Sequence, residues 1–394
     1  MNNPTSRSKD KVLCFVDYYL PGFKAGGPIR SISNLSDKVS PYLDFKIVAR
    51  DRDIDEGKPF SGILTNSWNS VSGSSIFYLK VGVVYFLHLF RVVKSKEHDV
   101  VYINSFFSLF FSFFPLIFSR ILNPSISIIL SPRGEFSPGA LSIKHFKKSI
   151  FISVFKFIGF HKLVFWHLTS EIDVKYLLKI FPDIYTKKIF VSSNFPNKIN
   201  KSLSILVPKP GSLKICFLSR VSKKKNLDFA LQSLMMVQSN VIFTIYGTIE
   251  DGAYWEYCLS LIERLPNNIN VVYYGHISNN LVNSELARHD LFFFPTRGEN
   301  FGHVIIEALS AGLPVLISDQ TPWSLIKKNE FIRIYSLSDP KMFASDIDDL
   351  ASLGSGRLHN LKLSAFDFAS DYSEDPNLLD LYLKMFAKAS NLTS

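Results

Sequence analysis

The chain has 394 residues, of which 47% are hydrophobic and 20% are charged. This composition excludes an intrinsically disordered chain, and the length suits two domains better than one. The formal net charge of +10 indicates an anionic partner, and nucleic acid, anionic lipid and a nucleotide-sugar are the candidates. The sequence contains no RNA-recognition motif, zinc-ligand spacing or recognition-helix pattern, so we do not expect a nucleic-acid partner.

The first half of the chain alternates predicted strands and helices. It begins with a polar segment, residues 1–10, that lacks an apolar core of signal-peptide length, and we therefore expect a cytoplasmic protein. A helix is expected over Arg30–Val39. The expected strands are Val12–Tyr18, Phe45–Ala49, Val100–Ile103 and Ile126–Ser131. This βαβ rhythm predicts a parallel sheet that is covered by helices on both faces.

Two apolar segments in this half raise the question of membrane contact. Residues 103–122 approach the length of a membrane span, but Pro115 and Arg120 interrupt them, and we expect a helix buried in the first domain. The segment Lys144–Trp166 is basic and aromatic. It is typical either of a helix on an anionic membrane surface or of a core-facing helix with a solvated basic rim, and both interpretations stay open.

The second half repeats the alternation after a polar, proline-containing joint at residues 200–211. A terminal helix is expected over Asp367–Ala389. The expected strands are Lys214–Leu218, Val241–Tyr246, Ile269–Tyr274, Leu291–Phe294 and Val315–Ser318. Two Rossmann-like domains follow from this pattern, but the glycines near the first strand lack the spacing of a dinucleotide fingerprint, which disfavours a dehydrogenase.

The segment that follows Leu291–Phe294 carries the strongest functional signal. It reads as a loop, a helix that ends at Gly312, and a further strand, with two carboxylates eight residues apart at Glu299 and Glu307. Glu299 would then lie beside a helix N-terminus at the carboxyl end of a strand, where open α/β sheets bind anionic ligands. Glu307, about one turn into the helix, can accept hydrogen bonds from two ribose hydroxyls. A glutamate pair alone is more often solvent-exposed, so the surrounding residues decide.

These surroundings resemble a known family. Residues 297–315, Arg-Gly-Glu-Asn-Phe-Gly-His-Val-Ile-Ile-Glu-Ala-Leu-Ser-Ala-Gly-Leu-Pro-Val, resemble the donor-site signature of the family-4 retaining glycosyltransferases, which have the GT-B architecture. Residues 214–227 resemble that family's strand-to-helix turn, residues 25–28 its glycine loop, and residues 131–137 its Pro-(His/Arg)-Gly segment. The four features occur in the family's order and span most of the chain.

The resemblance implies two Rossmann-like α/β domains that face each other across a cleft. Residues 1–205 would form the acceptor-side domain and residues 206–366 the nucleotide-sugar donor domain. Residues 367–394 would form a C-terminal helix that packs back on the first domain.

The resemblance also implies roles for individual residues. The catalytic group would be Glu299, Arg220 and Lys225, with the two cations clamping the donor diphosphate. The donor would further contact Glu307, Asn300, Phe301, Gly302, His303, Gly247 and Ile277. Gly26 and Gly27 would present N–H groups to a phosphate or to the acceptor. Many family members have His where this chain has Arg133, so that residue's role, at a donor or an acceptor phosphate, is open.

Each of these signals also has a plain structural explanation. The lysines at 223–225 fit a solvated basic loop, Gly26 and Gly27 fit an ordinary tight turn, and Arg133 fits an ordinary surface arginine. Cys14, Cys216 and Cys258 read as small buried hydrophobic residues in a reducing compartment.

We expect no metal and no cofactor. The donor-side loops contain no Asp-x-Asp motif, and the pattern Asp51-Arg-Asp53 lies in the first domain, where we treat it as chance. Cations and N–H dipoles would hold the leaving diphosphate instead. The resemblance implies retention of the anomeric configuration by front-face attack, with the leaving phosphate as base, and we assign no nucleophile.

The expected function is that of a hexosyl- or N-acetylhexosaminyltransferase in O-antigen, capsule or exopolysaccharide biosynthesis. Thr321-Pro322-Trp323 and the segment around Arg133 resemble members that serve bacterial surface polysaccharides. The donor would be a UDP- or GDP-sugar, and the acceptor a polyprenyl-diphosphate-linked saccharide at the inner face of the cell membrane, with the enzyme bound peripherally. A sugar-nucleotide epimerase and a non-catalytic nucleotide-sugar-binding protein are the alternatives. A glycoside phosphorylase is disfavoured, because no lysine has a context that fits pyridoxal phosphate.

Overall fold

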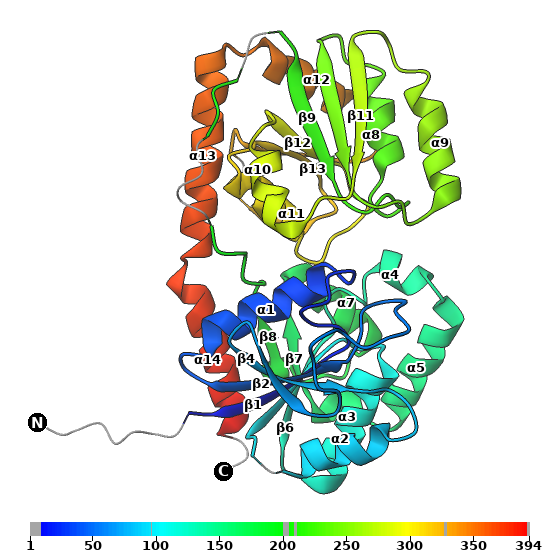
Figure 1. Ribbon diagram of the computed structural model, residues 1–394, viewed down its shortest axis with the longest axis vertical. Helices are drawn as coiled ribbons and strands as arrows, with labels where there is room; N and C mark the ends of the chain where they lie inside the picture. Colours follow the sequence, from blue (N-terminus) through cyan, green and yellow to red (C-terminus); the bar gives the residue numbers. More distant parts are fainter. Residues whose placement is uncertain (1–8, 96, 200–204, 209–210, 327–328, 392–394) are drawn as a thin grey trace, which may run out of the picture. The chain divides into compact units, whose positions relative to one another are not determined.

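The computed structural model describes residues 9–95, 97–199, 205–208, 211–326 and 329–391 (Figure 1). The chain forms two compact units: unit 1 runs to Phe195 and resumes at Pro376, and unit 2 comprises Pro196–Asp375. Most of the polar start of the chain, residues 1–8, and most of the expected joint, residues 200–204 and 209–210, lie outside the described residues.

The division between the units falls before the expected boundary at residues 205 and 206. Phe195 packs in the core of unit 1, whereas Ile199 already packs in the core of unit 2. A boundary placed by polar and proline composition misses this, because the packing partners of these two residues are distant in sequence.

Unit 1 contains an eight-stranded sheet in the order β3-β4-β2-β1-β5-β6-β7-β8. All neighbouring strands are parallel except β3, which pairs antiparallel with β4. The strands are β1 (Lys11–Val16), β2 (Asp44–Arg50), β3 (Trp68–Val71), β4 (Ser74–Leu79), β5 (Val100–Asn104), β6 (Ser127–Ser131), β7 (Phe165–Leu168) and β8 (Ile189–Val191). The four expected strands correspond to β1, β2, β5 and β6.

Helices cover both faces of this sheet, as the βαβ rhythm predicted. On one face, α1 (Gly27–Val39) and α14 (Pro376–Ser390) enclose a core that includes Cys14, Ile32 and Phe386. On the other face, the sheet packs against α2 (Tyr85–Lys94), η1 (Leu109–Phe113), α3 (Phe114–Leu122), α5 (His145–Phe157) and α7 (Glu171–Ile180). The short elements are α4 (Pro138–Ser142), α6 (Phe160–Leu163) and η2 (Thr186–Lys188).

The apolar segment 103–122 forms the end of β5, the π-helical turn η1 and α3. Pro115 is the second residue of α3, directly after η1, where the π-helical turn changes to an α-helix. Phe111 and Leu116 are buried against the sheet, which confirms the expected packing in the first domain. Among the described residues, no helix combines the length and the apolar character that crossing a bilayer requires.

Unit 2 contains a six-stranded parallel sheet in the order β11-β10-β9-β12-β13-β14. The strands are β9 (Leu213–Leu218), β10 (Val241–Tyr246), β11 (Ile269–Gly275), β12 (Leu291–Phe294), β13 (Val315–Ser318) and β14 (Ile332–Tyr335). The helices are α8 (Leu227–Leu234), α9 (Gly252–Ile262), η3 (Asn279–Leu281), α10 (Val282–Leu286), α11 (His303–Ser310), η4 (Pro322–Leu325), α12 (Pro340–Ser352) and α13 (Ser355–Ser373).

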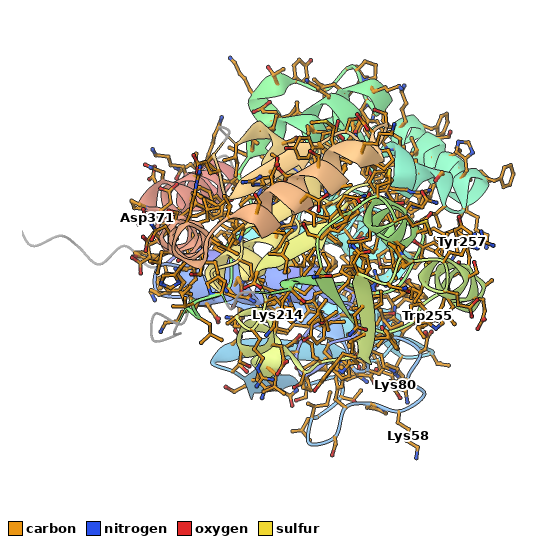
Figure 2. The ribbon with its side chains drawn as sticks, turned by 90° about the horizontal axis from the view of Figure 1, so that it is seen from above. Lys58, Lys80, Lys214, Trp255, Tyr257 and Asp371 are labelled. Atoms are coloured by element: carbon orange, nitrogen blue, oxygen red, sulfur yellow. The ribbon has the colours of Figure 1, made fainter. Side chains whose placement is uncertain are left out.

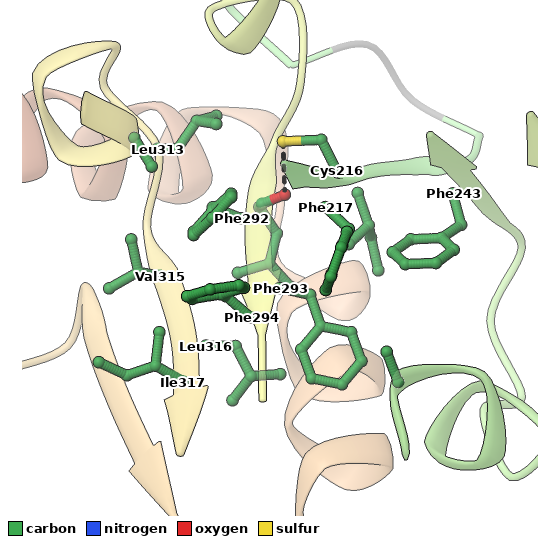
Figure 3. Close-up of a cluster of buried hydrophobic side chains, with 14 of the residues drawn as sticks. Cys216, Phe217, Phe243, Phe292, Phe293, Phe294, Leu313, Val315, Leu316 and Ile317 are labelled. Carbon is green, nitrogen blue, oxygen red and sulfur yellow. Dashed lines mark hydrogen bonds between the residues drawn. The ribbon is translucent and has the colours of Figure 1, made fainter. Parts of the chain in front are cut away.

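The core of unit 2 is built on the central strands (Figure 3). Phe292, Phe293 and Phe294 of β12 are fully buried, and so is Cys216 of β9, whose Sγ lies 3.7 Å from the Leu291 carbonyl oxygen. All three cysteines are buried and unpaired, as expected.

At the surface, charged side chains such as those of Lys58 and Lys80 project into solvent (Figure 2).

The expected terminal helix is two helices. α13 ends at Ser373 and packs through Leu358 and Ala365 in the core of unit 2. α14 begins at Pro376 and packs in the core of unit 1. Proline has no N–H and disfavours helical backbone at the residue before it, so the break falls at this point.

The ring of Phe386 in α14 packs edge-on against Phe45 and Tyr102 of the unit 1 sheet. We predict that Phe386→Ala lowers the free energy of unfolding of unit 1 by about 3–5 kcal/mol, because it leaves a cavity under the sheet. Urea unfolding measures the effect, with the exposed Lys384→Ala in the same helix as control. Equal unfolding midpoints for the two variants would show that α14 contributes little to the core of unit 1.

Candidate functional site

The sheet of unit 2 reverses its winding direction between β9 and β12. From β9 the chain winds outward to β10 and β11, and from β12 it winds the opposite way to β13 and β14. At such a switch point, the two flanking loops separate and leave room for a ligand at the carboxyl ends of the strands. The loop after β9 carries Arg220 and Lys225, and the loop after β12 carries Glu299.

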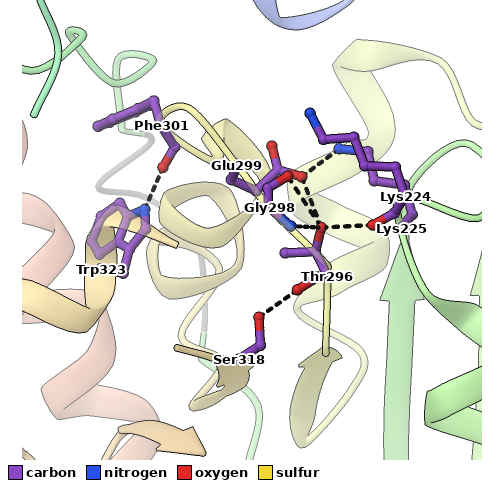
Figure 4. A network of polar contacts seen from close by, with 8 residues as sticks. All are labelled: Lys224, Lys225, Thr296, Gly298, Glu299, Phe301, Ser318 and Trp323. Atoms are coloured by element: carbon purple, nitrogen blue, oxygen red, sulfur yellow. Dashed lines mark hydrogen bonds and ion pairs between the residues drawn. The ribbon is translucent and has the colours of Figure 1, made fainter. Parts of the chain in front are cut away.

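Lys225 and Glu299 form an ion pair across this switch point (Figure 4). Their side chains are only 16% and 13% exposed, so the pair is largely shielded from water. The Lys225 ammonium also lies 5.5 Å from the centre of the buried Phe294 ring. Both residues belong to the predicted catalytic group, and the structure brings them together.

Hydrogen bonds to backbone oxygens hold the loop after β9 and the loop after β12 together. The Lys224 carbonyl accepts from the Arg297 N–H at 2.9 Å and lies 3.2 Å from the Thr296 hydroxyl. The Asn226 amide donates to the Pro295 carbonyl at 2.8 Å. Thr296 is fully buried, and its hydroxyl also lies 3.4 Å from Glu299 Oε1. The ion pair therefore rests on a fixed backbone frame rather than on two independent loops.

Thr296 and Asn226 were not predicted as residues of the site. Asn226 adopts a left-handed conformation with φ 65°, directly before α8, and its Oδ1 accepts from Arg297 Nε at 2.8 Å. An asparagine at a helix start was visible in the sequence, but its partners lie about 70 positions away, and only the sheet order identifies them.

Arg220 does not contact the Lys225–Glu299 pair. It is exposed and forms an ion pair with Glu250 at 3.0 Å, in the loop after β10. It stands at the same edge of the sheet, directly beyond the end of β9. An exposed pair of this kind contributes little to stability, so Arg220 can exchange Glu250 for an anionic ligand at small cost.

Gly247 is required by the backbone that surrounds it. Its φ is +139°, and a Cβ atom at this position would lie 1.8 Å from the carbonyl oxygen of Ser219, in the loop after β9. Its N–H donates to the Gly275 carbonyl at 2.8 Å, and its carbonyl accepts from the Tyr273 hydroxyl at 2.9 Å. The loops after β9 and β10 and the end of β11 thus meet at a position where no side chain fits.

Helix α11 begins beside the same switch point. Gly302 precedes it with φ +78°, and Gly312 follows it with φ +74°, which confirms the expected left-handed end of the helix. His303 is its first residue and is buried, with its ring centre 4.8 Å from that of Phe301. The first turn therefore offers backbone N–H groups at the carboxyl edge of the sheet.

Glu307 lies on α11 and is buried. It is 4% exposed, and its Oε1 accepts a hydrogen bond of 2.9 Å from the Asn197 amide. Asn197 was not predicted, because it lies 110 residues away, in the segment that leads from unit 1 into unit 2. This amide fixes the orientation of the carboxylate assigned to a ribose.

Three other predicted donor residues differ in their surroundings. The side chains of Phe301 and Ile277 belong to the unit 2 core, so only their backbone groups are available to a ligand. The Phe301 carbonyl accepts from the Trp323 indole at 2.5 Å. Asn300 is half-buried in the loop before α11.

The residues predicted for the acceptor and phosphate loop lie in unit 1. Gly26 has φ 64° and precedes α1, of which Gly27 is the first residue. The loop before them is held by Asp53, whose Oδ2 accepts from the Phe23 N–H at 2.7 Å and from the Lys24 N–H at 3.1 Å. Asp53, part of a pattern treated as chance from sequence, therefore supports this loop.

Arg133 lies inside a polar network of unit 1. Its guanidinium donates to Asn104 at 2.6 Å, to the Tyr102 hydroxyl at 2.7 Å and to Asn194. Because these contacts occupy its Nε and both terminal nitrogens, they favour a structural role, and contact with a phosphate stays a prediction.

The network continues from Tyr102 to His167. The Tyr102 hydroxyl lies 2.8 Å from His167 Nδ1, and His167 Nε2 lies 3.1 Å from the Ser192 carbonyl. Burial, with the nearby Arg133 charge, lowers the pKa of His167 to about 3. The ring is therefore neutral near pH 7, with Nε2 donating to the carbonyl and Nδ1 accepting from Tyr102.

A second polar cluster occupies the switch point of the unit 1 sheet, between β1 and β5. Asp17 directly follows β1, and its Oδ1 accepts from the Ser108 hydroxyl at 2.8 Å and lies 3.6 Å from Arg50. Burial raises the pKa of Asp17. Glu135, after β6, accepts from the Ser105 hydroxyl at 3.0 Å, and burial raises its pKa to about 7. Asp17 was not predicted as a residue of the site. The signal that could have identified it is a carboxylate at the end of a buried apolar run.

Comparison with known proteins finds a family model that matches one segment of the chain. Residues 199–362 match the family model described as Glycosyl transferases group 1. A Klebsiella pneumoniae protein, described as an uncharacterized 41.2 kDa protein in the cps region, is 25% identical over 244 residues. That match covers 59% of this chain and 64% of the relative, so it spans just under two thirds of the relative's length.

Two solved structures resemble the chain over almost its whole length. Anabaena Alr3699/HepE, in complex with UDP and glucose, has a TM-score of 0.68 at 15% identity and covers 96% of this chain and 100% of its own. The lipopolysaccharide outer core galactosyltransferase WaaB, in its apo form, has a TM-score of 0.65 at 16% identity, with 96% and 99% covered. At these identities the likeness shows the fold, which is the expected GT-B fold.

Gly247→Ala tests whether the glycine is required at the strand ends. The added Cβ would meet the Ser219 carbonyl oxygen, so we predict a loss of at least about 2 kcal/mol in the free energy of unfolding of unit 2. Gly252→Ala is the control, because its Cβ would meet nothing within 4 Å. Urea unfolding measures both variants, and wild-type stability of Gly247→Ala would contradict the close approach of these loops.

Proposed function

We propose that this protein is a retaining, metal-independent glycosyltransferase that uses a UDP- or GDP-sugar as donor. The observation that carries the proposal is the shielded Lys225–Glu299 pair at the switch point of unit 2, beside the N-terminus of α11. It lies within the segment that matches the group 1 glycosyl transferases. Alr3699/HepE, which shares the fold, binds UDP and glucose.

The donor diphosphate would occupy the carboxyl edge of the unit 2 sheet. Lys225 and Arg220 would neutralise the charge that develops on the leaving diphosphate, and the N–H groups at the start of α11 would add to this field. Glu307, oriented by Asn197, would accept hydrogen bonds from the ribose hydroxyls. Glu299 would exchange part of its contact with Lys225 for the sugar hydroxyls or the developing positive charge on the sugar ring.

Front-face transfer then needs no nucleophile from the protein. The bond from the anomeric carbon to the phosphate oxygen breaks, and the bond to the acceptor oxygen forms on the same face of the sugar. The acceptor hydroxyl gives its proton to the leaving phosphate. The contribution of the protein is to hold the diphosphate in place and to stabilise its charge, so positioning and electrostatics supply the catalysis.

The acceptor we propose is a polyprenyl-diphosphate-linked saccharide in the synthesis of O-antigen, capsule or exopolysaccharide. The Klebsiella relative is encoded in a cps region, and WaaB is a lipopolysaccharide galactosyltransferase. The net charge of +10 suits an anionic lipid-linked substrate and a peripheral position at the inner face of the cell membrane. The cluster around Asp17, at the switch point of unit 1, is the candidate place for the acceptor hydroxyl.

A donor screen tests the nucleotide-sugar site. With EDTA present, we expect the purified protein to bind or slowly hydrolyse a UDP- or GDP-sugar in preference to other nucleotide-sugars. Glu307→Ala should raise the donor Kd at least tenfold, because the ribose loses its carboxylate partner. Isothermal titration calorimetry measures the donor Kd of the wild type and of the variant. Turnover that requires a divalent cation would contradict metal independence, and turnover of the donor without an acceptor to a new nucleotide-sugar would identify an epimerase.

The ion pair separates a transferase from a protein that only binds nucleotide-sugars. We expect Lys225→Ala to lower kcat/KM at least about a hundredfold, because the leaving diphosphate loses a preorganised cation. Lys223→Ala is the matched control, since Lys223 is exposed in the same loop and should behave as wild type. Steady-state transfer with a radiolabelled donor measures both. Equal rates for the two variants would remove Lys225 from the catalytic group.

A further inference from the structure

Helix α5 of unit 1 presents an apolar stripe to solvent. Phe146, Ile150 and Phe157 are 76%, 49% and 93% exposed, and Val154 is exposed beside them. At 3.6 residues per turn, these four positions span only about 80° of the helix circumference. Phe155 is the one buried residue of the helix, and it points the opposite way, into the core. We call the four exposed residues the α5 stripe.

The core does not need the α5 stripe. The inward side of α5 already carries Phe151 and Phe155. The ring centre of Phe151 lies 5.5 Å from that of Phe113, and the ring centre of Phe155 lies 4.8 Å from that of Phe106. Of the two interpretations left open by sequence for residues 144–166, the core-facing one therefore explains only the inward side. Two phenylalanines three turns apart that are mostly exposed on one face indicate an interaction surface.

Positive charge borders the α5 stripe. Lys147 and Lys156 of α5 are exposed on either side of it, and Lys144 directly precedes the helix. Residues 136–170 contain five lysines and no aspartate or glutamate. An apolar stripe between lysines, without acidic residues, has the composition of a helix that lies in the interface of an anionic bilayer.

We propose that the α5 stripe docks on the surface of an anionic phospholipid bilayer. The axis of α5 would lie parallel to the membrane, with Phe146 and Phe157 inserted between the headgroups. Lys147 and Lys156 would lay their methylene chains along the apolar boundary and place their ammonium groups at the lipid phosphates. A second copy of the chain fits less well, because a symmetric contact would bring these lysines together.

Vesicle flotation tests the proposal with the full chain alone. Vesicles of equal parts phosphatidylglycerol and phosphatidylcholine should bind the protein, and phosphatidylcholine vesicles should bind it at least tenfold more weakly. Phe146→Ser combined with Phe157→Ser should weaken binding to the anionic vesicles at least tenfold. Lys147→Gln combined with Lys156→Gln should weaken it and reduce its dependence on salt.

Leu325→Ser and Lys341→Gln in unit 2 are matched controls for the loss of an exposed apolar and an exposed basic residue, and both should bind as wild type. Unchanged thermal unfolding of all variants excludes misfolding as the cause. Wild-type binding by the double serine variant, or no preference for anionic vesicles, overturns the proposal. Light scattering compares the molar mass of the wild type with that of the double serine variant. A lower molar mass of the variant also overturns the proposal, because the stripe would then join two copies.

The docking does not depend on the proposed transfer reaction. Flotation uses neither donor nor acceptor, so it succeeds or fails independently of the donor screen. Donor hydrolysis in solution should be unchanged in the double serine variant, because the α5 stripe lies in unit 1 and the donor residues lie in unit 2. Loss of both properties in that variant would show a general defect and overturn the assignment of a separate docking surface.

Discussion

The candidate site depends on the hydrogen bonds that the Lys224 carbonyl accepts from the loop after β12. They tie together two segments that the chain separates by about 70 residues, and they do so at the point where the sheet changes its winding direction. With the backbone fixed there, Lys225 and Glu299 can form a shielded pair without paying for loop ordering at each binding event. The same edge is closed on the other side by Gly247, which packs against the loop after β9. The backbone at the strand ends therefore sets the geometry of the site and positions the charged side chains.

The two units treat their polar groups differently. In unit 1, Arg133, Tyr102 and His167 satisfy one another inside the core, and low local polarity keeps the histidine neutral. In unit 2, the cations at the strand ends are held by single carboxylates, Glu299 and Glu250. A network with several partners for each group resists displacement, whereas a pair with one partner can be opened by a competing anion. This difference supports the proposal that the diphosphate binds in unit 2.

The sequence predicted what depends on local patterns. Buried apolar runs gave the bounds of β10 and β12 as the structure has them, and Gly312 marked the end of α11. β3 was missed because it is a short edge strand that is only partly buried. β4, the buried strand beside it, was also not predicted. The terminal helix was predicted as one element because the apolar period continues across Pro376. The contacts of Arg133 and the amide of Asn197 beside Glu307 join residues 29 to 110 positions apart, and no local pattern encodes them.

The return of α14 to unit 1 sets an order on biosynthesis. A ribosome delivers residues 196–375 of unit 2 before it delivers α14, yet α14 covers one face of the unit 1 sheet. Until then the faces of Phe45 and Tyr102 lack the ring of Phe386. Unit 2 can therefore complete its core before unit 1 does, although most of unit 1 precedes it along the chain. The nascent chain would present an incomplete unit 1 to chaperones until translation has passed α14.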